Sequence, residues 1–206
     1  MIPIFWTSDW HIGHSAVIRF SNRPFKNIDH MHRVLINNYN SVVSNNGICY
    51  MLGDIGLTKG SIIKEVIQEL NGTKILILGN HDKGKGTNFW LDCGFSCVLN
   101  QGTIYIQNER VTMTHCPLRG LYREDVKNMI GALDYENWHG ERKQFRYSIR
   151  NEGQFHLHGH IHSPNKGRSK RILNRQLDVG VDANQYRPVS YSQVQSWIHQ
   201  TLKTDN

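Results

Sequence analysis

Several kinds of segment are missing from this chain, and their absence narrows the classes of protein it belongs to. No apolar run approaches the roughly 18 consecutive residues that a membrane-spanning helix requires. The N-terminus lacks a basic segment followed by an apolar core and a cleavage site, so we expect no secretory signal and a cytoplasmic location. The 206 residues also contain no repeat and no low-complexity tract, and they suffice for a single domain with one sizeable core.

Cysteine is scarce, whereas histidine is abundant. The chain has 4 cysteines without a framework spacing, and the close pair Cys93 and Cys97 lacks the second pair that a structural zinc site requires. We therefore expect reduced thiols. The 12 histidines are more than a chain of this length usually carries, which directs attention to the positions where they cluster.

The net charge of +7 is confined to one part of the chain. Residues 110–175 contain thirteen Lys or Arg and six Asp or Glu, whereas the remainder has eleven of each. Such asymmetry favours an anionic partner, for example a nucleotide or a nucleic acid. A solvated basic surface that keeps the protein soluble is the alternative.

The first half of the chain alternates between buried strands and amphipathic helices. This alternation predicts a layered α/β fold. The apolar positions predict strands over 2–7, 48–52 and 74–78, and helices over 28–43, with Asp29 as the N-cap, and over 61–70.

The second half contains more strands and one weakly patterned segment. Residues 119–153 are polar and basic, and a helix over 123–133 is the one element we expect in them. We interpret this segment as an insertion in a single domain that covers residues 1–206. The expected elements are strands over 98–99, 103–107, 110–114, 154–158 and 177–181, with a turn at Asn108-Glu109, and a helix over 192–202.

Residues that can ligate a metal follow the expected strands. In open α/β sheets, sites form at the carboxyl ends of strands, where the loops converge. Asp-x-His and His-x-His spacings in an extended segment point alternate side chains the same way, and neighbouring glycines let the backbone turn sharply. The residues concerned are Asp9, His11, Asp54, Asn80, His81, His115, His160 and His162.

The order of these motifs resembles the calcineurin-like metallophosphoesterase superfamily, and in particular its small bacterial and bacteriophage members. The resemblance covers nearly the whole chain and is weakest over 119–153. The matching segments are Thr7-Ser8-Asp9-Trp10-His11-Ile12-Gly13-His14, Arg23-Pro24-Phe25, Gly53-Asp54, Gly79-Asn80-His81-Asp82, His115, Gly159-His160-Ile161-His162, Asp178-Val179-Gly180-Val181-Asp182 and Arg187-Pro188-Val189-Ser190.

The resemblance implies a four-layer αββα sandwich with a dinuclear metal site at the carboxyl ends of its strands. It implies that Asp9, His11 and His162 hold one ion, that Asn80, His115 and His160 hold the other, and that Asp54 bridges both. Imidazole, carboxylate and amide oxygen together suit divalent ions, of which we expect Mn, with Fe, Zn, Ni and Mg as alternatives. Two such ions can bind a bridging hydroxide, which is a nucleophile at neutral pH.

The resemblance makes His81 the general acid that protonates the leaving oxygen. The phosphoprotein phosphatases carry a further Asp after Gly-Asp that orients this histidine, whereas this chain reads Gly53-Asp54-Ile55-Gly56-Leu57. A protein phosphatase is thus disfavoured, and the partner of His81 is left open, with Asp82 the nearest carboxylate in sequence.

Four further side chains each have a functional and a structural interpretation. His14 contacts substrate or caps the following helix, and Arg23 contacts phosphate or forms a structural salt bridge. His156 and His158 support the ligands from behind, or they face solvent or a satisfied hydrogen bond; we favour the second interpretation.

The sequence predicts an enzyme, a metal-dependent phosphoesterase that hydrolyses phosphodiester bonds of a nucleotide or nucleic acid. A phosphomonoesterase such as a nucleotidase is the alternative within enzymes. A non-catalytic binding module on the same fold is the alternative outside them, and it is disfavoured because every ligand position and His81 are filled.

Overall fold

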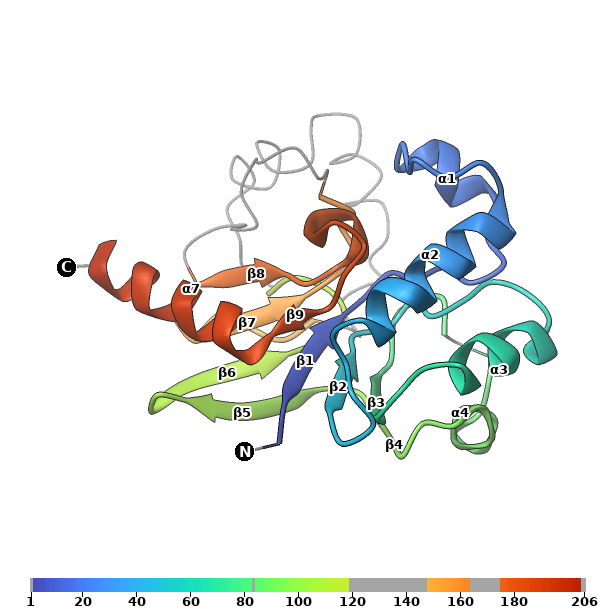
Figure 1. The fold of residues 1–206 in the computed structure, drawn as a ribbon. Coiled ribbons are helices and arrows are strands. Elements are labelled where there is room, and N and C mark those ends of the chain that lie inside the picture. The colour runs from blue at the N-terminus through green and yellow to red at the C-terminus, as the bar shows by residue number, and fades with distance from the viewer. Residues whose placement is uncertain (1, 83, 119–147, 164–174, 205–206) are drawn as a thin grey trace.

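The computed structural model describes residues 2–82, 84–118, 148–163 and 175–204. Within them the chain folds into two β-sheets with helices (Figure 1). The basic segment predicted as an insertion, and the helix expected inside it, lie almost wholly outside the described residues. No described helix is long and apolar enough to cross a membrane.

The first sheet has five strands in the order β4-β3-β2-β1-β9. β1 (Ile4–Thr7), β2 (Ile48–Met51), β3 (Thr73–Ile77) and β4 (Cys97–Leu99) are parallel, and β9 (Val189–Ser190) is antiparallel to β1. Because β1, β2 and β3 run in the same direction, the segments that follow them begin at one edge of the sheet.

The second sheet has four strands in the order β5-β6-β7-β8. β5 (Gly102–Ile106) and β6 (Glu109–Met113) form a hairpin, whereas β6, β7 (Phe155–His158) and β8 (Gln176–Asp178) are parallel. The hairpin turn is Gln107-Asn108, both at positive φ, one residue before the predicted turn. β8 ends at Asp178, so the predicted strand over 177–181 is too long; residues Val181–Asn184 form a 3-10 helix, η2.

Helices cover the outer face of the first sheet. α1 (Ala16–Phe20), α2 (Ile28–Asn40), α3 (Gly60–Gln68) and α4 (Thr87–Cys93) contribute to one hydrophobic cluster together with side chains of β1, β2 and β3. α2 begins after Asn27, whose side-chain oxygen accepts a hydrogen bond from the His30 N–H at 2.8 Å, so the predicted N-cap Asp29 was wrong.

A second hydrophobic cluster fills the space between the two sheets. Trp6, Leu52 and Ile77 of the first sheet and its loops meet the apolar side chains of β6, β7 and β8 there. The C-terminal helix α7 (Tyr191–Thr204) packs on this cluster, and the ring of its Trp197 lies edge-to-face on Phe155 with centroids 5.2 Å apart. The described residues therefore confirm the mixed α/β fold with two packed sheets and a helical layer on the first one.

Candidate metal centre

The predicted ligands come from the loops after strands of both sheets, and hydrogen bonds join these loops to one another. The N–H groups of Asp9 and His11 donate to the carbonyls of Gly53 and Asp54 at 3.1 and 3.0 Å. The Gly159 N–H donates to the His115 carbonyl at 2.9 Å. These hydrogen bonds join the loop after β1 to the loop after β2, and the loop after β6 to the loop after β7.

Two glycines let these loops approach one another. Gly53 lies at φ 83°, and a Cβ atom on it would overlap the backbone of Gly79. A Cβ atom on Gly159 would overlap the side chains of Ser8 and Asp9. Any larger residue at either position would push apart two segments that carry predicted ligands.

Five predicted ligands have a left-handed backbone, which side-chain-bearing residues rarely adopt. Their φ angles are 61° for Asp9, 52° for His11, 53° for Asp54, 74° for His160 and 47° for His162. The prediction that the Asp-x-His and His-x-His pairs converge because their segments are extended was therefore wrong. The backbone turns at each of these residues, and this turn aims the side chains.

The structure brings the predicted ligands into two overlapping groups. Ligand atoms of Asp9, His11 and His162 lie within 4.8 Å of one another, and so do those of Asp9, Asp54 and His115. The His11 and His162 Nε2 atoms are 3.1 Å apart. A third group joins His115 and His160 with the thiol of Cys116, a residue that the sequence analysis did not consider for the site.

Asp54 lies at the centre of the site. Its Oδ2 is 3.3 Å from His115 Nε2 and 3.8 Å from both His11 Nε2 and His81 Nε2. Its Oδ1 accepts a hydrogen bond from the His81 N–H at 3.0 Å. A single carboxylate therefore faces three imidazoles that come from different loops.

Two buried ligand atoms are poorly satisfied among the described residues. Oδ1 of Asn80 has no hydrogen-bond partner, and Nε2 of His115 has only the Asp54 carboxylate, 3.3 Å away. A buried polar atom without a partner is costly, which indicates a missing ligand at that place. The Nδ1 of His115 lies 2.7 Å from the Leu52 carbonyl, so in the neutral ring Nδ1 donates a hydrogen bond there and Nε2 carries the lone pair. Both atoms belong to the predicted second ion, and a cation would give Asn80 Oδ1 a partner, so the residues present fit a metal.

His162 is oriented by a carboxylate that the sequence analysis did not single out. Its Nδ1 lies 2.7 Å from Asp182 Oδ2, so Nε2 is free to face Asp9 Oδ1 at 3.8 Å. Asp182 was quoted as part of a matching segment, but sequence alone gave no signal that joins it to a histidine twenty residues earlier. Carboxylate–histidine pairs of this kind fix the tautomer of a ligand and raise its basicity.

Arg23 is part of this support and does not face substrate. Its Nε and Nη2 donate to the two carboxylate oxygens of Asp182 at 2.8 and 2.7 Å, and Nη2 also donates to the Asp9 carbonyl at 2.7 Å. Its side chain is 0% exposed. Of the two interpretations of Arg23, the structure shows the salt bridge, and we withdraw Arg23 as a substrate contact.

Asp82 does not orient His81. Its buried carboxylate accepts hydrogen bonds from the N–H groups of Asp54 and Gly79 on Oδ2 and from that of Ile55 on Oδ1, at 2.7 to 3.0 Å. It therefore fixes the backbone around Asp54. The ring of His81 is 41% exposed and stands edge-to-face to His11 with centroids 5.6 Å apart, so its ring nitrogens are accessible to a bound substrate.

His14 lies beside the site. Its Nδ1 is 3.4 Å from Nδ1 of His11, and it gives no side-chain cap to α1. Partial burial and the neighbouring His81 lower the pKa of His14, so it stays neutral at neutral pH. The capping alternative is therefore excluded, and the place of His14 agrees with a substrate contact.

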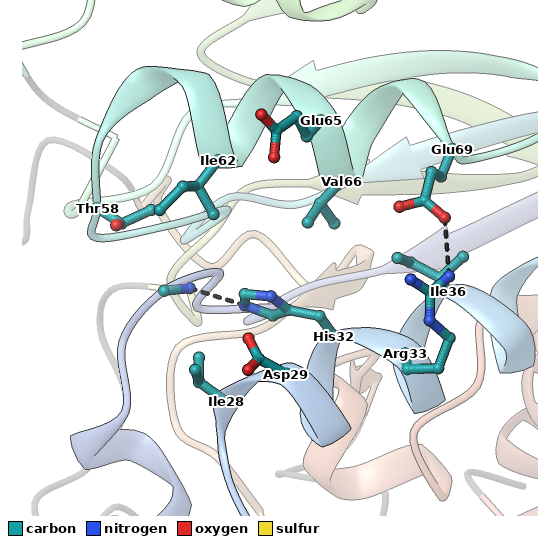
Figure 2. A pocket seen from close by; sticks show the side chains of 11 residues that line it. Ile28, Asp29, His32, Arg33, Ile36, Thr58, Ile62, Glu65, Val66 and Glu69 are labelled. Carbon is teal, nitrogen blue, oxygen red and sulfur yellow. Dashed lines mark hydrogen bonds and ion pairs between the residues drawn. The ribbon is translucent and has the colours of Figure 1, made fainter.

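The loop that carries His11 and His14 is also anchored to α2. A groove of about 460 Å³ lies between α2 and α3, and its lining includes His32 (Figure 2). The Gly13 N–H donates a hydrogen bond to His32 Nε2 at 2.9 Å. Asp29 and Glu65 line the same groove. None of the predicted ligands lines it, so it lies apart from the metal centre.

The buried charges of the ligand cluster shift the pKa values of one another. Burial raises the pKa of Asp9 to about 6. Burial would also lower the pKa of His115, but the charge and hydrogen bond of Asp54 outweigh it and raise that pKa to about 10. The same interaction holds the pKa of Asp54 low in spite of its burial. Since a ligating imidazole must be neutral, binding of a cation here releases a proton from His115.

His156 and His158 are both buried on one face of β7. The nitrogens of His156 lie 2.8 Å from the Thr112 hydroxyl and 3.1 Å from that of Thr114, so its hydrogen bonds are satisfied as we expected. His158 Nδ1 lies 2.8 Å from the Gly159 carbonyl, whereas its Nε2 has no hydrogen-bond partner among the described residues. Neither side chain faces solvent.

Comparison with known proteins places the chain among phage and archaeal sequences. No protein-family model matches it. The gene 66 protein of Mycobacterium phage L5 is 30% identical over 187 residues, which cover 89% of this chain and 88% of that protein. An uncharacterized protein of Methanocaldococcus jannaschii, MJ1445, is 44% identical over 85 residues, which are 40% of this chain and only 48% of that protein.

Among solved structures, the fold matches that of AQ665, a protein of unknown function from Aquifex aeolicus. The two superpose with a TM-score of 0.66 at 21% identity, over 96% of this chain and 100% of the other. This likeness shows a common fold over nearly the whole length of both chains.

Proposed function

We infer the chemistry of this chain from one premise, which is that it belongs to the calcineurin-like metallophosphoesterase superfamily, as a small member of the bacterial and bacteriophage type. A phosphoesterase activity follows from this membership. The finer proposal is a metal-dependent hydrolase of phosphodiester bonds in a nucleotide or nucleic acid. The observation that carries it is the convergence of the predicted ligands on Asp54, with the buried Asn80 Oδ1 left without a hydrogen-bond partner among the described residues.

In this proposal Asp9, His11 and His162 hold one divalent ion and Asn80, His115 and His160 hold a second, with Asp54 shared between them. When bound, such ions supply Lewis acidity to the phosphoryl group and lower the pKa of water. The chain's own contribution is to fix the ligands: Asp182 sets the tautomer of His162, and the Leu52 carbonyl that of His115.

His81 is proposed as the general acid. Its ring is close to Asp54, since Nε2 is 3.8 Å from Oδ2, and it is partly exposed on the side open to substrate. A protonated imidazole there donates its proton to the oxygen that leaves the phosphorus atom. His14, on the same side, is placed to hydrogen-bond the phosphate ester.

A diester is favoured over a monoester because Arg23 is withdrawn into the fold. The guanidinium of Arg23 hydrogen-bonds to the backbone of Asp9 and Trp10 and to Asp182, so its contacts are internal and do not leave it free for a phosphate. A monoester carries a second negative charge, and enzymes that prefer it usually add cations beside the metals. The single charge of a diester requires fewer such cations.

The test is a substrate comparison with the Mn²⁺-loaded protein. We expect a higher kcat/KM for bis(p-nitrophenyl) phosphate than for p-nitrophenyl phosphate at neutral pH, loss of both activities after exhaustive chelation, and recovery on adding Mn²⁺. A preference for the monoester, with nucleoside monophosphates as good substrates, would transfer the proposal to a nucleotidase. Full activity in the demetallated protein would end the proposal of a metal-dependent enzyme.

A further inference from the structure

The short helix α1 presents an aromatic ring to solvent beside the metal centre. Phe20 is 75% exposed, more than any other large hydrophobic side chain among the described residues. Its ring stands edge-to-face to His14 with centroids 6.4 Å apart, and the ring of His14 in turn lies 5.4 Å from that of His11. Figure 1 shows α1 at the end of the molecule towards which the arrow of β1 points.

Packing does not explain Phe20. A ring that is 75% exposed gains little from the hydrophobic effect, and in α1 only Val17 is buried. A single exposed apolar side chain is ordinary on a protein surface, so exposure alone indicates nothing. The position of Phe20 is what distinguishes it from the other exposed residues.

Ser21, which follows Phe20, ties this end of α1 to the site. The hydroxyl of Ser21 lies 3.3 Å from Nδ1 of His162, a predicted ligand. Arg19 is exposed and forms no ion pair with any described residue. α1 therefore offers an open ring beside the candidate metal centre, with an exposed arginine as its neighbour in sequence, and aromatic and basic side chains together hold single-stranded nucleic acid in many proteins.

We propose that Phe20 is a positioning residue on which a nucleobase next to the scissile phosphodiester stacks. This inference rests on the proposed function and names its substrate class: a nucleoside-bearing diester with at least one unpaired base. One imidazole, that of His14, separates Phe20 from His11, so a phosphate at the metal centre and its attached base reach both places through one sugar. Every base has a π-face, so the ring selects for a base without selecting its identity.

The closing experiment compares thymidylyl-(3′→5′)-thymidine with the same dinucleotide in which hydrogen replaces both thymines. With the Mn²⁺-loaded wild type, we expect the thymine-bearing dinucleotide to have a kcat/KM about 10-fold higher, within a range of roughly 5- to 150-fold for stacking on one base. Phe20→Ala abolishes this preference by raising KM for the thymine-bearing dinucleotide, and leaves kcat and the abasic substrate unchanged. Phe20→Trp restores it.

Tyr105→Ala is the matched control, because Tyr105 is 70% exposed but sits next to the turn of the β5–β6 hairpin, at the end of β6 opposite to His115. We expect no change in this variant. Equal loss on both dinucleotides in Phe20→Ala, or no base preference in the wild type, overturns the inference. Metal content and Tm, measured on each variant, verify that the site is intact.

A binding measurement separates this inference from the proposed function. Titration calorimetry compares thymidine 5′-monophosphate with 2-deoxyribose 5-phosphate on metal-loaded wild type and Phe20→Ala. If no dinucleotide is cleaved but the nucleotide binds about 10-fold more tightly only when Phe20 is present, the diesterase proposal fails and the stacking surface stands. If the ratio of the two dissociation constants is the same in both proteins, the stacking surface is overturned.

Discussion

At the scale of single residues, the candidate metal centre depends on side chains that are not themselves predicted ligands. Arg23 holds Asp182, Asp182 holds His162, and Arg23 also holds the carbonyl of Asp9. This chain of contacts joins residues from the first and last quarters of the sequence. Sequence reasoning could predict a ligand set but not this support, because an arginine that binds a carboxylate and one that binds a phosphate look the same in a sequence.

Replacing Arg23 tests that interpretation. Arg23→Met leaves Asp182 buried without its cation, so we expect the free energy of unfolding of the metal-free protein to fall by about 3–5 kcal/mol. Arg33→Met is the control: its pair with Glu69 is 62% and 46% exposed, and its loss should change stability by about 1 kcal/mol or less. Denaturant unfolding measures both. An Arg23 variant of normal stability with a raised KM would instead mean that Arg23 binds substrate.

His81 belongs to the same scale, and its variant separates proton donation from metal binding. His81→Ala should lower kcat by roughly 10²- to 10⁴-fold, because it removes a general acid, while two ions stay bound. The deficit should shrink for diesters whose leaving group is already a weak base. Metal analysis and a leaving-group series measure the two effects, and loss of an ion from this variant would make His81 a ligand.

At the scale of elements, β7 shows how a strand can carry buried histidines on one face and core residues on the other. Phe155 and Leu157 enter the cluster between the sheets, whereas His156 and His158 are buried on the opposite face. Burial lowers the pKa of His156 to about 3, with the neighbouring His158 as a further cause. The strand is therefore most stable when this imidazole is neutral.

The lowered pKa of His156 predicts that the stability of the fold depends on pH. Below pH 6.5 the unfolded chain takes up a proton on His156 that the folded chain refuses down to about pH 3, so acid favours unfolding over this range. From pH 6.5 to 5 the loss from this residue is about 2 kcal/mol. The glutamine side chain in His156→Gln does not titrate, so the free energy of unfolding of this variant should fall by about 2 kcal/mol less over the same pH range. Denaturant unfolding of the metal-free proteins measures the difference. Parallel curves for the two proteins would contradict the assignment.

The elements themselves were largely predictable where burial is periodic. α2 and α3 bury residues at helical spacing, and the parallel strands of the first sheet are continuous apolar runs, so only their boundaries needed correction by one to three residues. α1 and α4 were missed because they are short, and each buries only one or two side chains. Two turns of helix are too few to establish a period.

The ligand set was proposed from motif order, but its geometry was not derivable. Alternation along an extended strand gave a simple reason for the Asp-x-His spacing, and the left-handed φ of Asp9 and His11 shows a different one. Tertiary hydrogen bonds hold the backbone at these φ angles, for example those that the Asp82 carboxylate accepts from the backbone around Asp54. Local sequence does not contain that information.

At the scale of the whole molecule, the site joins the two sheets. Asp9 and Asp54 follow strands of the first sheet, whereas His115 and His160 follow strands of the second. Binding an ion between them therefore connects both halves of the core. Any ligand that binds only the folded state stabilises it by mass action.

Metal loading should consequently raise the stability of the entire fold. At a free Mn²⁺ concentration of 100 times the dissociation constant, each ion should add about 2.7 kcal/mol to the free energy of unfolding. Asp54→Ala should lose the gain from both ions, because its carboxylate faces both groups of ligands, whereas His11→Ala should lose chiefly one. Thermal unfolding with and without Mn²⁺ measures this, and an Asp54 variant that keeps two ions would refute the bridging role.

The left-handed residues of the metal centre have a consequence for the history of such proteins. A side chain held at positive φ costs roughly 1 kcal/mol or more, and glycine or asparagine would relieve most of it. Selection for stability alone would therefore replace Asp9, His11, Asp54, His160 and His162 early. A homologue that is no longer under selection for activity should therefore accumulate glycine and asparagine at these positions first. Its sequence would then show the loss of function while the fold is still unchanged.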